Sequence, residues 1–141
     1  ECDLFFDKPL LEKVVRGEGD CSILVSPYNR ATMDGTVIRT DGDKAKALII
    51  KKHQIKDFDY SGYMKTVNVY KFKKDFMLNH FLPAVSTYVQ YESVNSYYEL
   101  VLGSLIYYGN SDIRVVMIEE DAWAEIDNAE DLARAEKKFK R

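Results

Sequence analysis

Short apolar runs, separated by charged or turn-forming segments, divide the chain into strands and helices. We expect the end of a strand in ECDLFF (1–6) and buried strands in CSILVS (21–26) and IRVVMI (113–118), because four to eight apolar residues in a row are typical of such strands. MKTVNVYKF (64–72) alternates side-chain types, which predicts another strand, and WAEI (123–126) predicts a short one.

A β-hairpin is the clearest local signal. GTVIRTDGDKAKALIIKK (35–52) contains two runs of strand-forming residues on either side of Asp41, Gly42 and Asp43. Gly42 can adopt the positive φ that a tight turn requires. The pattern therefore predicts two antiparallel strands joined at Gly42.

Apolar stripes at helical spacing predict four helices, and Pro83 is expected to bend or split the second of them. The stretches are DKPLLEKVVRG (7–17), KKDFMLNHFLPAVSTYV (73–89), VNSYYELVLGSLIYYG (94–109) and NAEDLARAEKKF (128–139). Helices interleaved with strands, together with one antiparallel hairpin, predict a mixed α/β fold.

Length and composition indicate one globular domain, residues 1–141, with 46% hydrophobic and 30% charged residues. The formal net charge of −3 argues against a surface for nucleic acid, which would carry clustered basic residues. No apolar run reaches the length of a membrane span. Cys2 and Cys21 lack a metal-binding spacing, so we interpret them as buried thiols in a reducing cytoplasm.

Two aspartates stand at strand ends, where ligands bind in open α/β sheets. Asp3 lies in the first strand, and Asp127 follows WAEI. Two converging carboxylates can hold Mg²⁺ for phosphoryl or nucleotidyl transfer. The alternative for Asp127 is structural, since Asn128 is a good N-cap and an acid beside it favours a helix N-terminus. Spacing alone favours that structural interpretation.

Two further residues could contact a ligand or could have only a structural role. Asp34 precedes Gly35 in the polar loop SPYNRATMDGTV (26–37), either presenting its carboxylate or closing a turn. Lys65 begins a strand among tyrosines, either neutralising a phosphate or facing solvent. Aromatic residues make up 13% of the chain, and several flank acids, as in SYYE (96–99) and WAEID (123–127). Such a wall suits an ammonium ligand, although tyrosines also pack core rims and interfaces.

The ordered set of segments resembles a family. ECDLFFDKPLLEKVV, MDGTVIRTDGDKAKALIIKK, YMKTVNVYKF, YYELVLGSLIYYG and WAEIDNAEDLARAE follow one another as in sugar-phosphate-type nucleotidyltransferases. The closest likeness is to cytidylyltransferases that act on phosphocholine or 2-aminoethylphosphonate, some of them fused to phosphoenolpyruvate phosphomutase. Nearly the whole chain is covered, and it aligns with the later part of that domain.

The resemblance implies a Rossmann-like mixed sheet with flanking helices, transfer of a cytidylyl group from CTP to a phosphocholine- or phosphonate-type acceptor, and release of pyrophosphate. It implies Mg²⁺ at Asp3 and Asp127, and Lys65 as the catalytic contact to the acceptor's phosphate or phosphonate. It places the remaining candidates near the acceptor's ammonium group. These are Asp34, Tyr98, Glu99 and Trp123.

Two other functions stay open. One is a non-catalytic interaction module whose tyrosines bind a partner, and the other is a sugar-1-phosphate nucleotidyltransferase. Convergence of Asp3 and Asp127 would favour the metal site, whereas amide and hydroxyl donors in the pocket would favour a sugar. An exposed sheet edge, expected if the N-terminal nucleotide-binding strands are missing, would favour pairing with a second copy.

The family's Gly-rich nucleotide loop has no counterpart here, because the glycines closest in sequence, Gly17 and Gly19, are flanked by acid. We therefore predict that this chain alone binds CTP weakly and turns nothing over. A cytidylyl-transfer assay with phosphocholine and 2-aminoethylphosphonate checks this, and robust turnover would contradict it.

Overall fold

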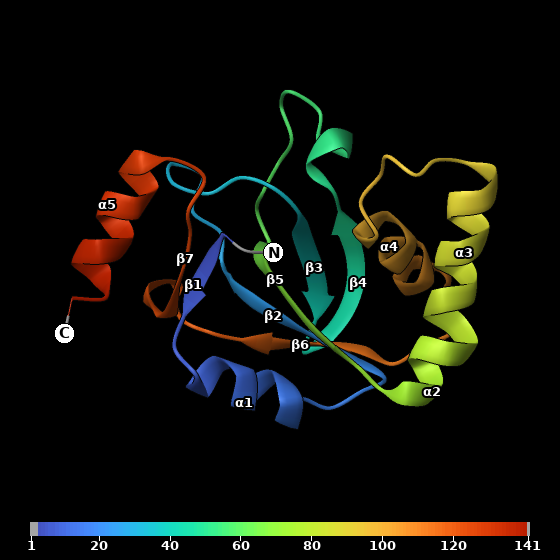
Figure 1. Ribbon diagram of the computed structural model, residues 1–141. Coiled ribbons are helices and arrows are strands. Elements are labelled where there is room, and N and C mark those ends of the chain that lie inside the picture. Colours follow the sequence, from blue (N-terminus) through green and yellow to red (C-terminus); the bar gives the residue numbers. More distant parts are fainter. Residues whose placement is uncertain (1–2, 141) are drawn as a thin grey trace.

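A computed structural model describes residues 3–140, in which a strand-rich centre lies between two groups of helices (Figure 1). Seven strands form a two-stranded sheet, β1–β7, and a closed five-stranded sheet in the order β2–β5–β3–β4–β6. The strands are β1 (Leu4–Phe6), β2 (Cys21–Pro27), β3 (Val37–Asp41), β4 (Lys44–Ile49), β5 (Tyr63–Phe72), β6 (Ile113–Met117) and β7 (Trp123–Glu125).

The helices confirm the predicted stretches. They are α1 (Pro9–Arg16), α2 (Lys74–Phe76), α3 (Leu82–Tyr91), α4 (Glu99–Tyr108) and α5 (Ala129–Lys138), with short turns η1 (Lys51–His53), η2 (Met77–Phe81) and η3 (Glu120–Ala122). Among residues 3–140, no helix has the length and apolar character needed to cross a membrane. Pro83 lies just after the π-helical turn η2, which joins α2 to α3. The wider turn accommodates a residue that has no N–H to donate.

The closed sheet corrects the expectation of a Rossmann-like sheet, while the mixed α/β character and the β3–β4 hairpin are confirmed. Only β2 and β6 pair in parallel, and the other pairs are antiparallel. The hairpin turns at Gly42, whose φ is +58°, and brings Lys44 opposite Arg114 of β6. That one pair, with a hydrogen bond of 2.8 Å from Val115 N–H to Asp43 O, closes the sheet.

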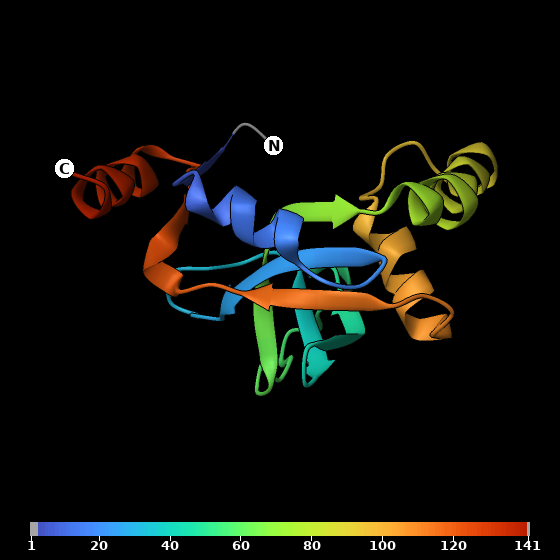
Figure 2. The same cartoon turned by 90° about the horizontal axis from the view of Figure 1, so that it is seen from below.

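Two hydrophobic clusters lie on the two sides of strand β2, whose residues 21–26 are buried. Ile23 and Val25 point into the cluster beneath α4 and the α2–α3 helix, and Leu24 points into the cluster beneath α1 and β7. Figure 2 shows α1 along β2 and β6, with α5 and α3 at opposite ends of the molecule. A strand with apolar side chains on both faces is buried on both, which explains the unbroken run CSILV.

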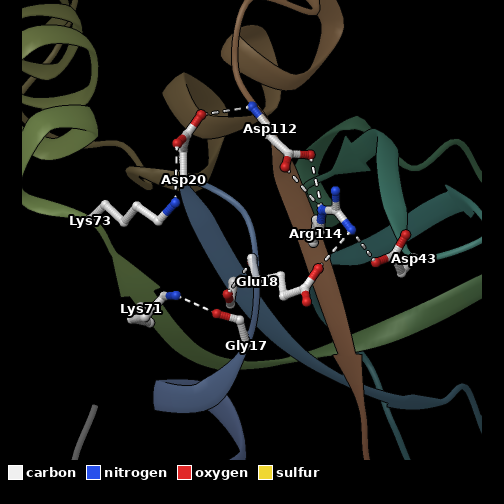
Figure 3. A network of polar contacts seen from close by, with 9 residues as sticks. Gly17, Glu18, Asp20, Asp43, Lys71, Lys73, Asp112 and Arg114 are labelled. Carbon is white, nitrogen blue, oxygen red and sulfur yellow. Dashed lines mark hydrogen bonds and ion pairs between the residues drawn. The ribbon is translucent and has the colours of Figure 1, made fainter.

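Arg114 links the segments that meet at the seam, the place where the five-stranded sheet closes (Figure 3). Its guanidinium lies 3.0 Å from carboxylate oxygens of Asp112 and Asp43 and 3.3 Å from Glu18. Asp112 and Asp43 raise the pKa of Arg114, with the hydrogen bond to Asp112 the largest cause and the one to Asp43 next. One side chain thus joins β6 to the hairpin turn and to the segment after α1.

We predict that Leu102→Ala lowers the free energy of unfolding by about 2–5 kcal/mol, because Leu102 is fully buried in α4 against the first cluster. Tyr107→Ala is the control on the same helix, since the Tyr107 side chain is 80% exposed, and its effect should stay within about 0.5 kcal/mol. Urea denaturation measures both values, and equal effects would contradict the packing described.

Candidate active-site groove

The pairing of β1 with β7 brings the two predicted metal ligands to the same end of one ribbon. Leu4 lies opposite Glu125 and Phe6 opposite Trp123. The pairing continues beyond the strands, because the Ile126 N–H donates to Asp3 O at 2.8 Å. Asp3 is therefore the strand neighbour of Ile126, the residue before Asp127. Residues more than a hundred positions apart meet here through main-chain hydrogen bonds.

Alternation along β7 decides which of its side chains face the core. Trp123 is buried in the second cluster with Leu4 and Phe6, and Glu125 lies two residues further on the same face. Glu125 meets Lys65 of β5, whose Nζ is 3.5 Å from Glu125 Oε2. The Lys65 Nζ also lies 5.8 Å from the centre of the Trp123 ring.

Lys65 is fully buried, although it carries a positive charge. Its side chain is 1% exposed, and its Nζ donates no hydrogen bond to any residue from 3 to 140. Burial of an ammonium group is costly unless a counter-charge is near, and Glu125 supplies one. Gly35 is close on another side, since a Cβ built there would lie 3.1 Å from Nζ. The φ of Gly35 is +96°, a conformation that suits glycine.

A groove lies between the loop 28–36 and the start of α5, and Glu125 of this ion pair forms part of its lining. It consists of two adjoining hollows of about 350 Å³ and about 190 Å³, both of which Glu125 lines. Asp127 and Asp34 line the larger hollow, and Trp123 lines the smaller one. Residues common to both hollows are Thr32, Met33, Glu125, Asp131 and Arg134. Lys65 lines neither, so Glu125 stands between it and the groove.

Two of the acids that line the groove, Asp34 and Asp131, form ion pairs with basic side chains. Asp34 forms an ion pair with Lys51, and this contact raises the pKa of Lys51. Asp131 pairs with Arg134, and its other oxygen accepts from the Asp127 N–H at 3.2 Å. The Asn128 side chain accepts from the N–H groups of Glu130 and Asp131, which confirms it as the N-cap of α5. These bonds fix the backbone that carries Asp127.

Aromatic and amide contacts fix the opposite wall, the loop 28–36. Tyr28 stacks on Tyr60 with ring centres 4.5 Å apart, and its hydroxyl donates to Met33 O. Gln54 accepts from the Tyr60 hydroxyl and donates to Gly35 O at 2.7 Å. Burial raises the pKa of Tyr28 to about 12, and the contact with Tyr60 acts in the same direction. Gly35 is thereby held beside Lys65.

Asp3 offers one feature that suits a cation. Its Oδ1 is buried and has no hydrogen-bond partner among the described residues 3–140. No group of three or more His, Cys, Asp or Glu side chains in that range could hold a metal ion. Mg²⁺ needs fewer protein ligands, since it commonly takes one or two carboxylates and completes its shell with water and phosphate oxygens. Asp127, which lines the larger hollow, is one such carboxylate, and Asp3 is the second that the resemblance implies.

Two sequence-predicted residues lie elsewhere. Glu99 begins α4 at the end of the molecule away from β7, is 3% exposed, and accepts from the Tyr70 hydroxyl at 3.5 Å. Tyr98 contacts the rings of Tyr70 and Phe81 edge-on. Burial, followed by the charge of Glu99, raises the pKa of Tyr70. Asp34, Trp123 and Asp127 line one groove, and Lys65 lies behind Glu125. The main chain of Asp3 pairs with Ile126, and Tyr98 and Glu99 lie away from the groove.

The sequence did not identify Glu125 as a site residue. It also did not identify the clamp, by which we mean the contacts among Tyr28, Gln54 and Tyr60 that hold the loop 28–36. A signal for Glu125 was present in the two-residue period of WAEID, which places Trp123, Glu125 and Asp127 on one face. No comparable signal marked the clamp, because its members come from separate loops.

The chain is similar to known proteins in sequence and in fold. No protein-family model matches the chain. The chain is 28% identical over 140 residues to CMP-5'-(3-aminopropyl)phosphonate synthase of Streptomyces rubellomurinus, covering 99% of this chain and 22% of that protein. The fold is similar to that of the inositol-1-phosphate CTP transferase from T. maritima (TM-score 0.64, 18% identity, 98% of this chain and 52% of that one).

It is also similar to the nucleoside-diphosphate-sugar pyrophosphorylase from Vibrio cholerae RC9 (TM-score 0.55, 16% identity, 99% of this chain and 53% of that one). The chain thus spans about half the length of these two structures and under a quarter of the curated relative. The chain therefore shares its fold with parts of these two structures, and its whole length is similar to part of the phosphonate synthase.

We predict that Gly35→Ala destabilises the protein more than Gly62→Ala. Both glycines have positive φ, so each alanine should cost about 1–2 kcal/mol of backbone strain. Only the Cβ at position 35 meets Lys65, whereas the one at position 62 meets nothing within 4 Å. The first variant should lose about 1 kcal/mol more, because the buried ammonium shifts from Glu125. Equal losses in denaturant unfolding would contradict the contact.

Proposed function

We propose that this chain is the acceptor- and metal-binding part of a nucleotidyltransferase that passes a cytidylyl group from CTP to a phosphonate- or phosphocholine-type acceptor, with release of pyrophosphate. One observation carries the proposal: Asp127 and Glu125 line one groove, and Glu125 forms an ion pair with the buried Lys65 behind it. The 28% identity to an aminopropylphosphonate synthase over the whole chain supports the choice of acceptor.

The residues in the groove would perform positioning and charge compensation, which is most of what nucleotidyl transfer asks of a protein. An oxygen of the acceptor's phosphonate attacks the α-phosphorus of CTP, and the bond from that phosphorus to the pyrophosphate oxygen breaks. Asp3 and Asp127 would hold Mg²⁺, which supplies positive charge to the phosphate oxygens. Lys65 would add its charge from below, and the backbone of the capped α5 terminus keeps Asp127 in place.

The groove's composition favours an acceptor that carries an ammonium group over one that carries the neutral hydroxyls of a sugar. A sugar calls for amide and hydroxyl donors along the walls, whereas the larger hollow is lined mainly by charged side chains. They are Arg30, Asp34, Glu125, Asp127, Asp131 and Arg134, and only Thr32 and Asn128 offer a hydroxyl or an amide. The amide oxygen of Asn128 is already used in capping α5.

We predict that the chain binds 3-aminopropylphosphonate in the presence of Mg²⁺, and that Lys65→Met weakens this binding about tenfold. Methionine would leave the Glu125 carboxylate in the groove without its counter-charge, and the resulting repulsion of the phosphonate corresponds to about 1.4 kcal/mol for a tenfold change. Isothermal titration calorimetry measures the affinities, and Lys137→Met, an exposed lysine of α5, should leave them unchanged.

Glucose 1-phosphate is the competing ligand for the same experiment. It should bind more weakly than 3-aminopropylphosphonate or phosphocholine. Equal or tighter binding of glucose 1-phosphate would replace the proposed acceptor class with a sugar phosphate. Binding that does not respond to Lys65→Met would remove Lys65 from the site.

A further inference from the structure

The end of the molecule that η2, α3 and α4 form carries very little charge. From Phe76 to Tyr91 the sequence contains no Asp, Glu, Lys or Arg, although these residues make up 30% of the chain. The only charged residue of α4 is Glu99, which is buried. Of the fifteen large hydrophobic residues that are exposed within residues 3–140, nine lie between positions 78 and 108. A helix that faces water usually carries charged side chains on that side, so this surface is unusual.

Three aliphatic residues form an apolar stripe on the helix that α2, η2 and α3 make together. Leu78, Leu82 and Val89 follow one another at spacings of four and seven residues, which places them on one helical face. All three are exposed, so nothing within residues 3–140 covers the stripe. No residue of α3 is buried, and Val85 packs only partly buried against the first hydrophobic cluster. Figure 1 shows α3 at the edge of the molecule, on the opposite side from α5.

We propose that this apolar stripe is the interface of a weak homodimer, in which the helix of one copy packs antiparallel against the same helix of a second copy. A two-fold interface uses the same patch on both subunits. Leu78 and Val89 stand near the two ends of the stripe, and Leu82 stands near its middle. Antiparallel packing therefore sets Leu78 of one copy against Val89 of the other and brings both Leu82 side chains close to the two-fold axis.

Charge explains why a second copy suits the stripe. A surface placed against these residues loses least when it also has no charged groups to desolvate. The same stripe on another copy meets this condition. Charged residues occur only at the ends, with Lys74 and Asp75 before the stripe and Glu92 after it. Parallel packing would bring two Glu92 side chains together, whereas antiparallel packing sets Glu92 beside Lys74 and Asp75, whose charges cancel.

The size of the helix determines how strong this contact is. The continuous helix from Lys74 to Tyr91 is about 27 Å long at about 1.5 Å per residue. Contact along that length, over a width of about 10 Å, buries on the order of 500 Å² per copy once the relief of the side chains is included. The total of roughly 1,000 Å² is at the low end for specific interfaces, so the dimer should dissociate on dilution.

The groove does not take part in this contact. It lies beside β7 and α5, and α3 lies at the other end of the molecule (Figure 2). A dimer through α3 therefore leaves the grooves of both copies open to their ligands. The inference does not depend on the proposed function, because it uses only the shape and charge of the helical end.

Sedimentation velocity on the full chain, over a range of concentrations, tests the inference. We expect the mass to approach twice the 16.3 kDa of one chain at about 500 µM and to fall to that of one chain below about 10 µM. Leu82→Arg should have the mass of one chain throughout, because it places two positive charges at the two-fold axis. The control is Val15→Arg, at an exposed aliphatic residue of α1, and it should dimerise like the unaltered protein.

A mixing experiment identifies the partner as a second copy. Leu82→Glu should also have the mass of one chain, and mixing it with Leu82→Arg should restore the doubled mass, because opposite charges then meet at the axis. A single-chain mass for the unaltered protein at every concentration overturns the inference. So does a doubled mass that Leu82→Arg leaves unchanged, or a mixture that stays monomeric. If circular dichroism shows that a Leu82 variant has lost its helices, Val89→Arg decides by the same criterion.

Discussion

The antiparallel pairing of β1 with β7 is the constraint on which the groove depends. It is made of only three residue pairs and the hydrogen bond from Ile126 to Asp3, yet it joins the first described strand to the last. A two-stranded ribbon is marginal by itself in water. Here Phe6 and Trp123 pack on α1 and β2 through the second hydrophobic cluster, and this burial stabilises the ribbon. The positions of Glu125 and Asp127 follow directly from that packing.

The closed sheet contributes the other half of the site. Strand β5 positions Lys65 in the interior, and the loop before β3 positions Gly35 beside the Lys65 ammonium group. The Arg114 contacts hold the seam of the closed sheet, and the stacked rings of Tyr28 and Tyr60 hold the loop that carries Gly35. The groove therefore combines a rigid wall with a charged floor, and neither requires a large rearrangement to receive a small ligand.

Local patterns predicted nearly all the elements, because apolar spacing, Gly42, Pro83 and the cap at Asn128 each act over a few residues. The sheet's closure was not predictable in this way. It depends on Lys44 meeting Arg114, a pairing of residues seventy positions apart that leaves no local trace. The same limit explains the candidates. Asp3 and Asp127 were identified by resemblance and by strand-end position, and the ribbon places the main chain of Asp3 beside Ile126, the residue before Asp127.

Tyr98 and Glu99 show the opposite case. Like WAEID, their segment places an acid close to aromatic residues. Only the three-dimensional contacts distinguish the buried Glu99, which pairs with Tyr70, from a carboxylate that lines the groove. Lys65 could be singled out from its motif, but its complete burial could not. Burial depends on β7, β5 and the loop 28–36 converging, and no single segment encodes that.

The two-residue period of β7 has a consequence for how this sequence can vary. Substitutions along WAEID change one side chain at a time, but the insertion of a single residue between Trp123 and Asp127 would turn every following side chain to the other face. Glu125 and Asp127 could not then both face the groove while Trp123 remains in the core. Selection on such a site should act on spacing as strictly as on residue type. Changes in length would be tolerated instead in the largely exposed stretch 92–97, where the chain forms no strand and the sheet imposes no register.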